Sequence, residues 1–233
     1  MHRCILAFFM ACTSFLHAGA QRVLLIEDSS LSLIGEYLEV YVPDRELDFA
    51  EVLQARDAFV PAQSNTPNLG TEAHSIWLKL RIQNKHPRNT LNLFIANPTL
   101  DEVALYHQPG PGLPFKHQLL SKRLPLATRP YKGAEFVFPI APPDAPTEYF
   151  IRIKSEQPLI LPVSVNLPID QLDALVRKNW LNGIYFGVVV IMALYNFFLY
   201  TSVRDSSYLY YVVFICTAGI TQLALKGIAF QYF

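Results

Sequence analysis

Two uncharged apolar runs constrain this chain more than any other feature of its sequence. Residues 179–200 contain no charged side chain, and a helix of that length spans about 33 Å, which matches the hydrocarbon core of a bilayer. Residues 208–225 form a second uncharged run. The connection between the two runs, residues 201–207, is short. The sequence therefore predicts an antiparallel transmembrane hairpin.

Charge and proline divide the chain where these runs begin. Residues 179–233 carry three charged side chains, whereas residues 21–178 carry 34. All 17 prolines lie at or before Pro168. Because membrane spans tolerate few charges and loop-rich domains use many prolines, we expect a soluble domain over residues 21–177 and a membrane segment over residues 178–233.

The N-terminal residues form a third zone. A weakly basic start precedes an apolar run from Cys4 to Leu16, and Ala18-Gly19-Ala20 supplies the small-residue pattern that signal peptidase accepts. The apolar run is short for a membrane span. We therefore predict a cleaved signal peptide, residues 1–20, in preference to an uncleaved anchor.

Export of the domain sets the expected topology. It places residues 21–177 outside the membrane, so the first span runs inward and Arg204 is cytoplasmic. Cys4 and Cys12 leave with the signal and Cys216 lies in an apolar run, so the exported domain has no disulfide. A domain of this size buries roughly 70% of its unfolded surface without one. We expect a protein of the bacterial inner (cytoplasmic) membrane with a periplasmic N-terminal domain.

Short alternating runs fill the exported domain. In residues 77–82 apolar and basic side chains interleave, and residues 149–154 behave similarly. Alternation at period two places one set of side chains on a core face and the other towards solvent. Many short strands separated by Pro, Gly and Asn predict an all-β, antiparallel jelly roll or β-sandwich, with one short helix within residues 49–59. The expected strands are residues 23–26, 37–42, 75–83, 91–96, 102–107, 134–140, 148–153 and 161–166.

Catalytic chemistry is sparse in this domain. His74, His86, His107 and His117 show no metal-ligand spacing, and the sequence has no Gly-rich phosphate loop or G-x-S-x-G elbow. Acidic pairs are neighbours in sequence, so in a strand they point to opposite faces. We therefore expect no catalytic residue, no metal and no cofactor, and a protein that is not an enzyme. The 19 basic and 19 acidic side chains argue against nucleic acid as a partner.

A ligand-binding surface is the better expectation. Residues 21–176 carry 14 basic and 18 acidic side chains, which disfavours a strongly anionic polymer and leaves a neutral or mildly polar glycan or another small molecule. Trp77 is alternatively a core residue, and the basic residues alternatively face water or pair with carboxylates. The candidates, with Trp77 and Arg129 foremost, are Trp77, Lys79, Arg81, Tyr106, Arg129 and Arg152.

The membrane segment has candidate packing residues. Gly183 and Gly187 form a G-x-x-x-G, which lets a neighbouring helix approach closely, although two glycines at this spacing also occur by chance. Asn196 and Gln222 place amides at lipid depth, where an unsatisfied amide is costly. A hairpin offers few partners, so we expect these residues to pack against further helices of a larger bundle.

Several motifs, taken in their order along the chain, resemble one family of receptors. In the exported domain they are Phe59-Val60-Pro61, Ser75 to Arg81 with Asn84, Asn97 to Tyr106, Arg129, Tyr149 to Arg152 and Leu161-Pro162. In the membrane segment they are Tyr195 to Leu199, Arg204-Asp205, Tyr208 to Tyr211, Gly227 and Phe230-Gln231-Tyr232. Over residues 28–233 the chain resembles the seven-transmembrane receptors with diverse intracellular signalling modules, in the version with the second type of extracellular domain.

The resemblance implies a periplasmic jelly roll, similar to carbohydrate-binding modules, that feeds a seven-helix membrane domain. It implies as partners a periplasmic glycan or small-molecule ligand, membrane lipids, the remaining transmembrane helices, and a histidine kinase or diguanylate cyclase output module. The sequence contains two of the seven spans, so we expect a truncated seven-helix domain. The leading hypothesis is the sensory end of a bacterial receptor. The alternatives are a membrane-anchored carbohydrate-binding or adhesion module without signalling and, less favoured, a glycan hydrolase.

Overall fold

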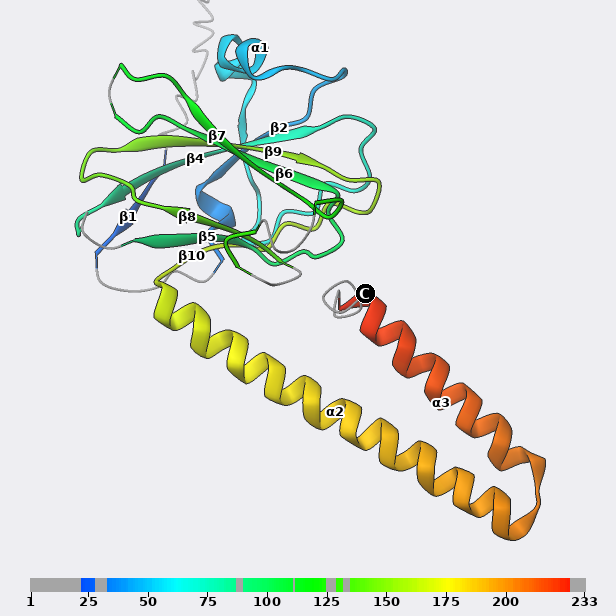
Figure 1. The fold of residues 1–233 in the computed structure, drawn as a ribbon. Helices are drawn as coiled ribbons and strands as arrows, with labels where there is room; N and C mark the ends of the chain where they lie inside the picture. The colour runs from blue at the N-terminus through cyan, green and yellow to red at the C-terminus, as the bar shows by residue number, and fades with distance from the viewer. Residues whose placement is uncertain are drawn as a thin grey trace, which may run out of the picture.

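The computed structural model describes residues 22–27, 33–86, 90–110, 112–124, 129–131 and 135–226. Within these residues the chain forms two packed β-sheets and a hairpin of two long helices (Figure 1). The predicted signal peptide, residues 1–20, and the family motifs in residues 227–233 lie outside the described residues.

The larger sheet has seven strands, in the order β3-β2-β4-β9-β6-β7 with β1 paired to β4. Its strands are β1 (Val23–Ile26), β2 (Leu38–Tyr41), β3 (Val60–Pro61), β4 (Ile76–Asn84), β6 (Glu102–His107), β7 (Lys116–Ser121) and β9 (Thr147–Lys154). The pairs are antiparallel except that β1 runs parallel to β4, with Val23 opposite Arg81. The parallel pair departs from the predicted all-antiparallel sheet. It forms because the connection from β1 to β4 is long enough for a crossover and the pairing buries Leu24 and Ile26.

The smaller sheet has three strands in the order β10-β5-β8. They are β5 (Leu91–Ile95), β8 (Phe136–Ile140) and β10 (Val163–Asn166). The two sheets face each other (Figure 1), and alternate residues of β4, such as Ile76 and Leu78, are buried between them. Burying a side chain of this size contributes roughly 1.5–3 kcal/mol. The predicted antiparallel β-rich domain in the form of a sandwich is therefore confirmed.

All eight expected strands are present, with ends that differ from the expected ones by at most two residues. Two further strands, β3 and β7, were not predicted from the sequence. β7 is an edge strand with one neighbour, β6, and its first four residues are exposed or half-buried. An edge strand of this kind needs little apolar alternation, so it leaves a weak signal in the sequence.

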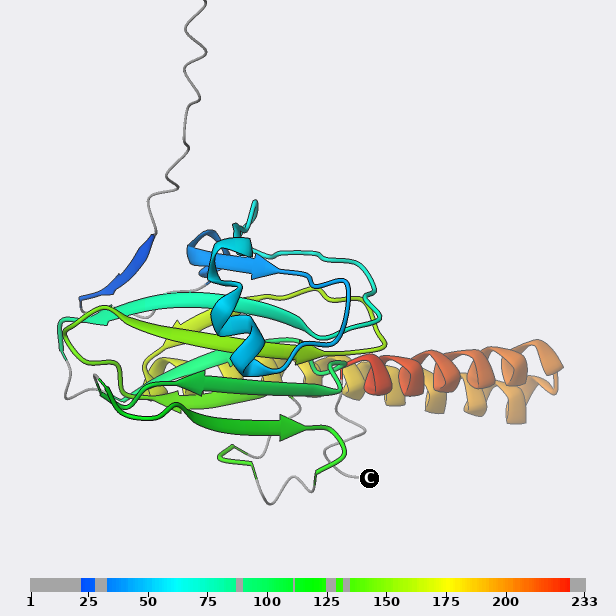
Figure 2. The same ribbon diagram turned by 90° about the horizontal axis from the view of Figure 1, so that it is seen from above.

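The helix expected within residues 49–59 is α1 (Phe49–Gln54), followed by a 3₁₀ turn over Arg56–Ala58. Asp48 begins α1 with a capping box: its carboxylate accepts the Glu51 N–H at 2.8 Å, and the Glu51 carboxylate accepts the Asp48 N–H at 2.9 Å. The helix lies across the larger sheet, on the face turned away from the smaller sheet (Figures 1 and 2).

The two long helices leave the sandwich from the side of the smaller sheet (Figure 1). α2 (Pro168–Val203) follows β10 after one residue, and α3 (Ser206–Leu225) returns antiparallel to it. The turn is short because Arg204 adopts a left-handed backbone (φ 62°) and the Asp205 carboxylate accepts the Ser207 N–H. Both helices are long and apolar enough to cross a membrane. α2 measures about 54 Å, and the domain boundary expected at residues 177 and 178 lies inside it.

The helices pack through a small residue and a polar contact. A Cβ added at Gly219 would lie 3.2 Å from Val189 Cγ1, and Lys226 Nζ donates to Asn182 Oδ1 at 2.7 Å. A Cβ added at Gly183 or at Gly187 would meet no atom within 4 Å.

The two predicted amides differ in their surroundings. Asn196 is buried, and its side-chain amide donates to Met192 O of its own helix at 2.8 Å. Gln222 is half-buried. Packing of Gly183, Gly187, Asn196 and Gln222 against further helices therefore stays a prediction.

Candidate ligand-binding site

The strand register of the larger sheet places five of the six predicted binding residues on one face. The opposite pairs are Trp77–Arg152, Lys79–Phe150, Arg81–Glu148 and Tyr106–Phe150. Residues directly opposite each other across two strands share a face of the sheet. The alternate residues of the same strands belong to the core between the sheets. We call the face that carries these pairs, turned away from the smaller sheet, the outer face.

Trp77 lies inside an aromatic cluster on the outer face. We define this cluster as Phe49, Phe59, Trp77, Tyr106, Phe115 and Phe150. Trp77 is 0% exposed, and the Phe49 ring of α1 lies 6.0 Å from its ring at an interplanar angle of 26°. In this conformation Trp77 packs as a core residue, which is the alternative weighed from the sequence. Its Nε1–H is buried and has no hydrogen-bond partner in the described part of the chain.

The basic candidates on the outer face lie beside carboxylates. Lys79 Nζ is 2.5 Å from Glu39 Oε2, and Arg81 donates to Glu148 Oε1 from Nη2 at 2.8 Å and from Nε at 3.2 Å. The charges of Lys79 and Arg81 are therefore neutralised by the neighbouring carboxylates of Glu39 and Glu148. Arg152 is 3.5 Å from a carboxylate oxygen of Glu102, which is long for a hydrogen bond. Arg152 is therefore the least committed of the three.

Arg129 lies apart from the other five candidates. It is buried rather than facing water, its guanidinium lies 5.0 Å above the Phe136 ring, and Nη2 donates to Ser121 O at 3.0 Å. Burial lowers the pKa of this guanidinium. Phe136 belongs to the core between the sheets, so Arg129 packs against the core while the other candidates share the outer face.

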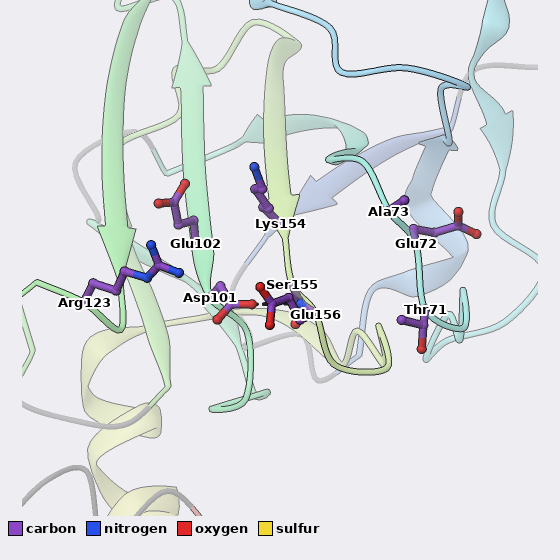
Figure 3. A pocket seen from close by; sticks show the side chains of 9 residues that line it. All are labelled: Thr71, Glu72, Ala73, Asp101, Glu102, Arg123, Lys154, Ser155 and Glu156. Carbon is purple, nitrogen blue, oxygen red and sulfur yellow. Dashed lines mark hydrogen bonds between the residues drawn. The ribbon is translucent and has the colours of Figure 1, made fainter.

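A hollow of about 600 Å³ lies at one end of the outer face (Figure 3). Its lining combines four carboxylates with two cations: Glu72, Asp101, Glu102 and Glu156 with Arg123 and Lys154. Thr71, Ala73 and Ser155 complete it. We call it the polar hollow.

Antiparallel pairing brings the walls of the polar hollow together. Glu102 begins β6, and it lies opposite Lys154 at the end of β9 and Ser121 at the end of β7. Ile76 begins β4 and lies opposite Ile153. Because antiparallel neighbours start where the others end, the segments before β4 and β6 and after β7 and β9 meet at one edge of the sheet.

Asp101 is the structural centre of the polar hollow. Its Oδ2 accepts the Glu156 N–H at 2.8 Å, and its carboxylate pairs with Lys122. Burial by itself raises the pKa of this carboxyl, but the hydrogen bonds from Lys122 and the Glu156 N–H, with the charges of Lys122 and Arg123, outweigh burial and hold the pKa below its usual range. Asp101 is therefore ionised at neutral pH and ties the end of β9 to the start of β6.

Four other side chains of the hollow are uncommitted. Among the described residues, the side chains of Arg123, Lys154, Glu72 and Glu156 form no close ion pair and no hydrogen bond. The charges of Arg123 and Lys154 act on Asp101 and Glu46 only from a greater distance. Arg123 and Glu102 stand on one side of the hollow, and Glu72 stands on the other (Figure 3). The hollow thus presents two anions and two cations to a ligand. This arrangement suits a ligand that both donates and accepts hydrogen bonds.

Sequence reasoning missed the polar hollow. None of its nine residues is among the six predicted binding residues, and Asp101 and Glu102 belong to the acidic pairs that, as neighbours in sequence, were not expected to be catalytic. The available signal was the position of the charges: Asp101-Glu102 and Lys154-Ser155-Glu156 both stand at ends of expected strands. Loops at strand ends are where binding residues concentrate.

Comparison with known families agrees with this two-part structure. The family described as 7TMR-DISM extracellular 2 matches residues 35–166, and the one described as 7TM diverse intracellular signalling matches residues 178–233. No curated protein matches the chain. The first match covers the sandwich from β2 to the end of β10, and the second covers most of α2 and all of α3. The chain therefore belongs to the seven-transmembrane receptors with diverse intracellular signalling modules, in which an extracellular sensory domain is joined to membrane-spanning helices.

Proposed function

We propose that the β-sandwich is the periplasmic sensor of a receptor in a bacterial inner membrane, and that it binds a small carbohydrate-like ligand at the polar hollow. The observation that carries this proposal is the position of the hollow in the chain. Ser155 and Glu156, on its rim, begin the stretch of residues that runs through β10 into α2.

The chemistry of the hollow favours a ligand rich in hydroxyl groups. Hydroxyls donate to the free carboxylates of Glu72 and Glu156 and accept from Arg123 and Lys154. These four charges sum to zero, so a neutral ligand satisfies them without leaving an excess of either sign. The net negative charge of the whole domain also disfavours a strongly anionic ligand.

A continuous backbone path links the hollow to the membrane helix. Leu159 N–H donates to Gly70 O at 2.7 Å, and Leu161 N–H donates to Pro67 O at 2.9 Å. The chain that follows one rim of the hollow is therefore paired with the chain that precedes the other rim, Thr71 to Ala73. A ligand that draws the two rims together shifts these two hydrogen-bonded segments. The second of them continues along the chain into β10 and α2.

Lys178, ten residues after the first residue of α2, ties this helix to the sandwich through an ion pair with Glu135. Glu135 directly precedes β8 of the smaller sheet, so a shift of the sheets reaches the helix by a second route. Ligand binding changes the balance of two helix arrangements only by its differential affinity for them. We propose that the helices pass this change to a cytoplasmic output module such as a histidine kinase or a diguanylate cyclase.

The proposal is tested by ligand screening of the whole chain in detergent. Neutral mono-, di- and oligosaccharides are screened by thermal shift, and hits are measured by calorimetry for the wild type, Arg123→Ala and Lys116→Ala. Lys116 is an exposed residue of β7 outside the hollow and serves as the matched control. We expect a hit that Arg123→Ala weakens about tenfold or more, equivalent to 1.4 kcal/mol, and that Lys116→Ala leaves unchanged. A screen without a hit refutes the carbohydrate ligand.

A further inference from the structure

The aromatic cluster under α1 has the geometry of an occupied ring-binding site. Phe49 lies 4.3 Å from the Tyr106 ring at an interplanar angle of 14° and stacks on Trp77 as well. Near-parallel stacking of this kind is how a flat ring ligand lies on an aromatic floor. The Phe49 side chain is half-buried, with Trp77 and Phe150 fully buried next to it. Phe49 thus lies between the sheet and solvent, in the place of a ligand.

The buried indole of Trp77 points to the same conclusion. Its Nε1–H has no acceptor among the described residues, and a buried donor without an acceptor is unfavourable. No side chain of α1 supplies the acceptor, because Phe49, Val52 and Leu53, which pack on the cluster, are apolar. A ligand oxygen that lies on Trp77, Tyr106 and Phe150, which we call the aromatic floor, would supply it.

The aromatic floor lies beside the polar hollow. Arg152 is opposite Trp77, and Lys154, two residues further along β9 on the same face, lines the hollow. Two residues of a strand span about 6–7 Å, which is close to the length of one sugar ring. A ligand of several rings whose first ring lies in the hollow therefore extends past Arg152. Its next ring can lie on the aromatic floor once Phe49 is displaced from that floor.

Few polar contacts hold α1 in place. In the described part of the chain, the hydrogen bonds of Phe49–Gln54 stay within residues 45–55. The tethers to the sheet lie before and after the helix: Glu46 accepts from Ser75, and Arg56 pairs with Glu148. A six-residue helix has little stability of its own. Between its two tethers, α1 is held on the sheet by apolar side chains.

We propose that Phe49 is a built-in plug, and that Trp77, Tyr106 and Phe150 form a second subsite for a ring with an apolar face and an acceptor oxygen. The occupant is an inner ring of a neutral oligosaccharide whose first ring lies in the polar hollow, so the inference rests on the proposed function. Ligand and Phe49 compete for the floor. The plug lowers the apparent affinity by the fraction of molecules in which the floor is open, and binding displaces α1.

Trp77 provides a direct readout. The chain has two tryptophans, so in a Trp180→Phe background the emission of the whole chain in detergent reports on Trp77 alone. The probes are methyl glucoside, as a single ring, and the linear hexasaccharides maltohexaose, cellohexaose and chitohexaose. Each probe is titrated into three proteins in this background: the one that keeps Phe49, the Phe49→Ala variant, and the matched control Phe49→Tyr, which keeps a ring on the floor. Phe49→Leu replaces Phe49→Ala if the alanine variant does not show a cooperative melt.

We expect at least one hexasaccharide to shift the Trp77 emission and to bind about tenfold more tightly to Phe49→Ala, with no change for Phe49→Tyr. The single ring binds all three variants alike. If Arg123→Ala weakens the binding of a hexasaccharide but Phe49→Ala does not strengthen it, Phe49 is not a plug and the polar hollow alone is the site. If Phe49→Ala binds a hexasaccharide more tightly and Arg123→Ala does not change the affinity, the aromatic floor is supported as a binding site and the polar hollow is refuted. Absence of binding by every variant refutes both.

Discussion

Removal of the Asp101 carboxylate should loosen the polar hollow and the chain that leads from it to α2. Asp101→Ala deletes the acceptor of the Glu156 N–H, at 2.8 Å, and the ion-pair partner of Lys122. The Asp101 side chain is 13% exposed and that of Lys122 is 39% exposed. The backbone hydrogen bond is therefore the better shielded of the two interactions.

The expected loss of stability follows from these two contacts. A hydrogen bond to a charged group contributes about 1.5–3 kcal/mol, and a half-exposed ion pair contributes up to about 1 kcal/mol. We expect Asp101→Ala to lower the free energy of unfolding by about 3 kcal/mol, which is a fall of roughly 6–12 °C in melting temperature for a domain of this size. Asp101→Asn keeps an acceptor oxygen for the Glu156 N–H and should lose about 1 kcal/mol.

The assay is urea unfolding of the whole chain in detergent, followed by Trp77 emission in the Trp180→Phe background. Asp144→Ala is the matched control, because Asp144 is 60% exposed and pairs with the exposed Lys85 at 3.2 Å. It should change the free energy of unfolding by less than about 0.5 kcal/mol. If Asp101→Ala is no more damaging than Asp144→Ala, or Asp101→Asn is as damaging as Asp101→Ala, the hydrogen bond to Glu156 does not hold this segment.

Three further predictions concern acid stability, the aromatic floor and topology. The pKa of Asp101 lies below its ordinary value of 3.8, so its stabilisation is complete above that value and is lost as the pH falls through the folded pKa. The wild type should therefore lose stability in acid more steeply than Asp101→Asn in urea titrations. Trp77→Ala should lower the free energy of unfolding by about 3–5 kcal/mol and Trp77→Phe by clearly less, since the indole N–H has no acceptor to lose; equal losses in urea unfolding would contradict this. A reporter fused after Asp205 should read cytoplasmic and one at residue 170 periplasmic, and the reverse would overturn the export argument.

The strands could be predicted because their alternation is a local property. Trp77-Leu78-Lys79-Leu80-Arg81-Ile82 places apolar residues on one face whatever its neighbours are, and the same pattern put Trp77, Lys79 and Arg81 together on the other face. The choice between core and binding roles for Trp77 was not local. It depended on α1, whose Phe49 covers the indole, and the sequence does not reveal where a six-residue helix docks.

The polar hollow escaped sequence reasoning for a related reason. Its walls come from four segments between Thr71 and Glu156, and only the pairing order β4-β9-β6-β7 brings their ends to one edge. Arg129 shows the converse. From the sequence it was a binding candidate that alternatively faces water or pairs with a carboxylate, yet the guanidinium packs on Phe136 and is buried.

By itself the sequence determined the division into a β-rich domain and an apolar helical hairpin, the positions of all strands except β3 and β7, and the family. Each of these depends on local composition and period, or on the order of motifs. The tertiary structure alone decided which charges are neutralised and which are free. Lys79 pairs with Glu39 and Arg81 pairs with Glu148 across paired strands, whereas Arg123 and Lys154 form no close ion pair within the described residues. Strand pairing joins residues that are far apart in sequence, and hydrogen bonds and ion pairs act only over a few ångströms.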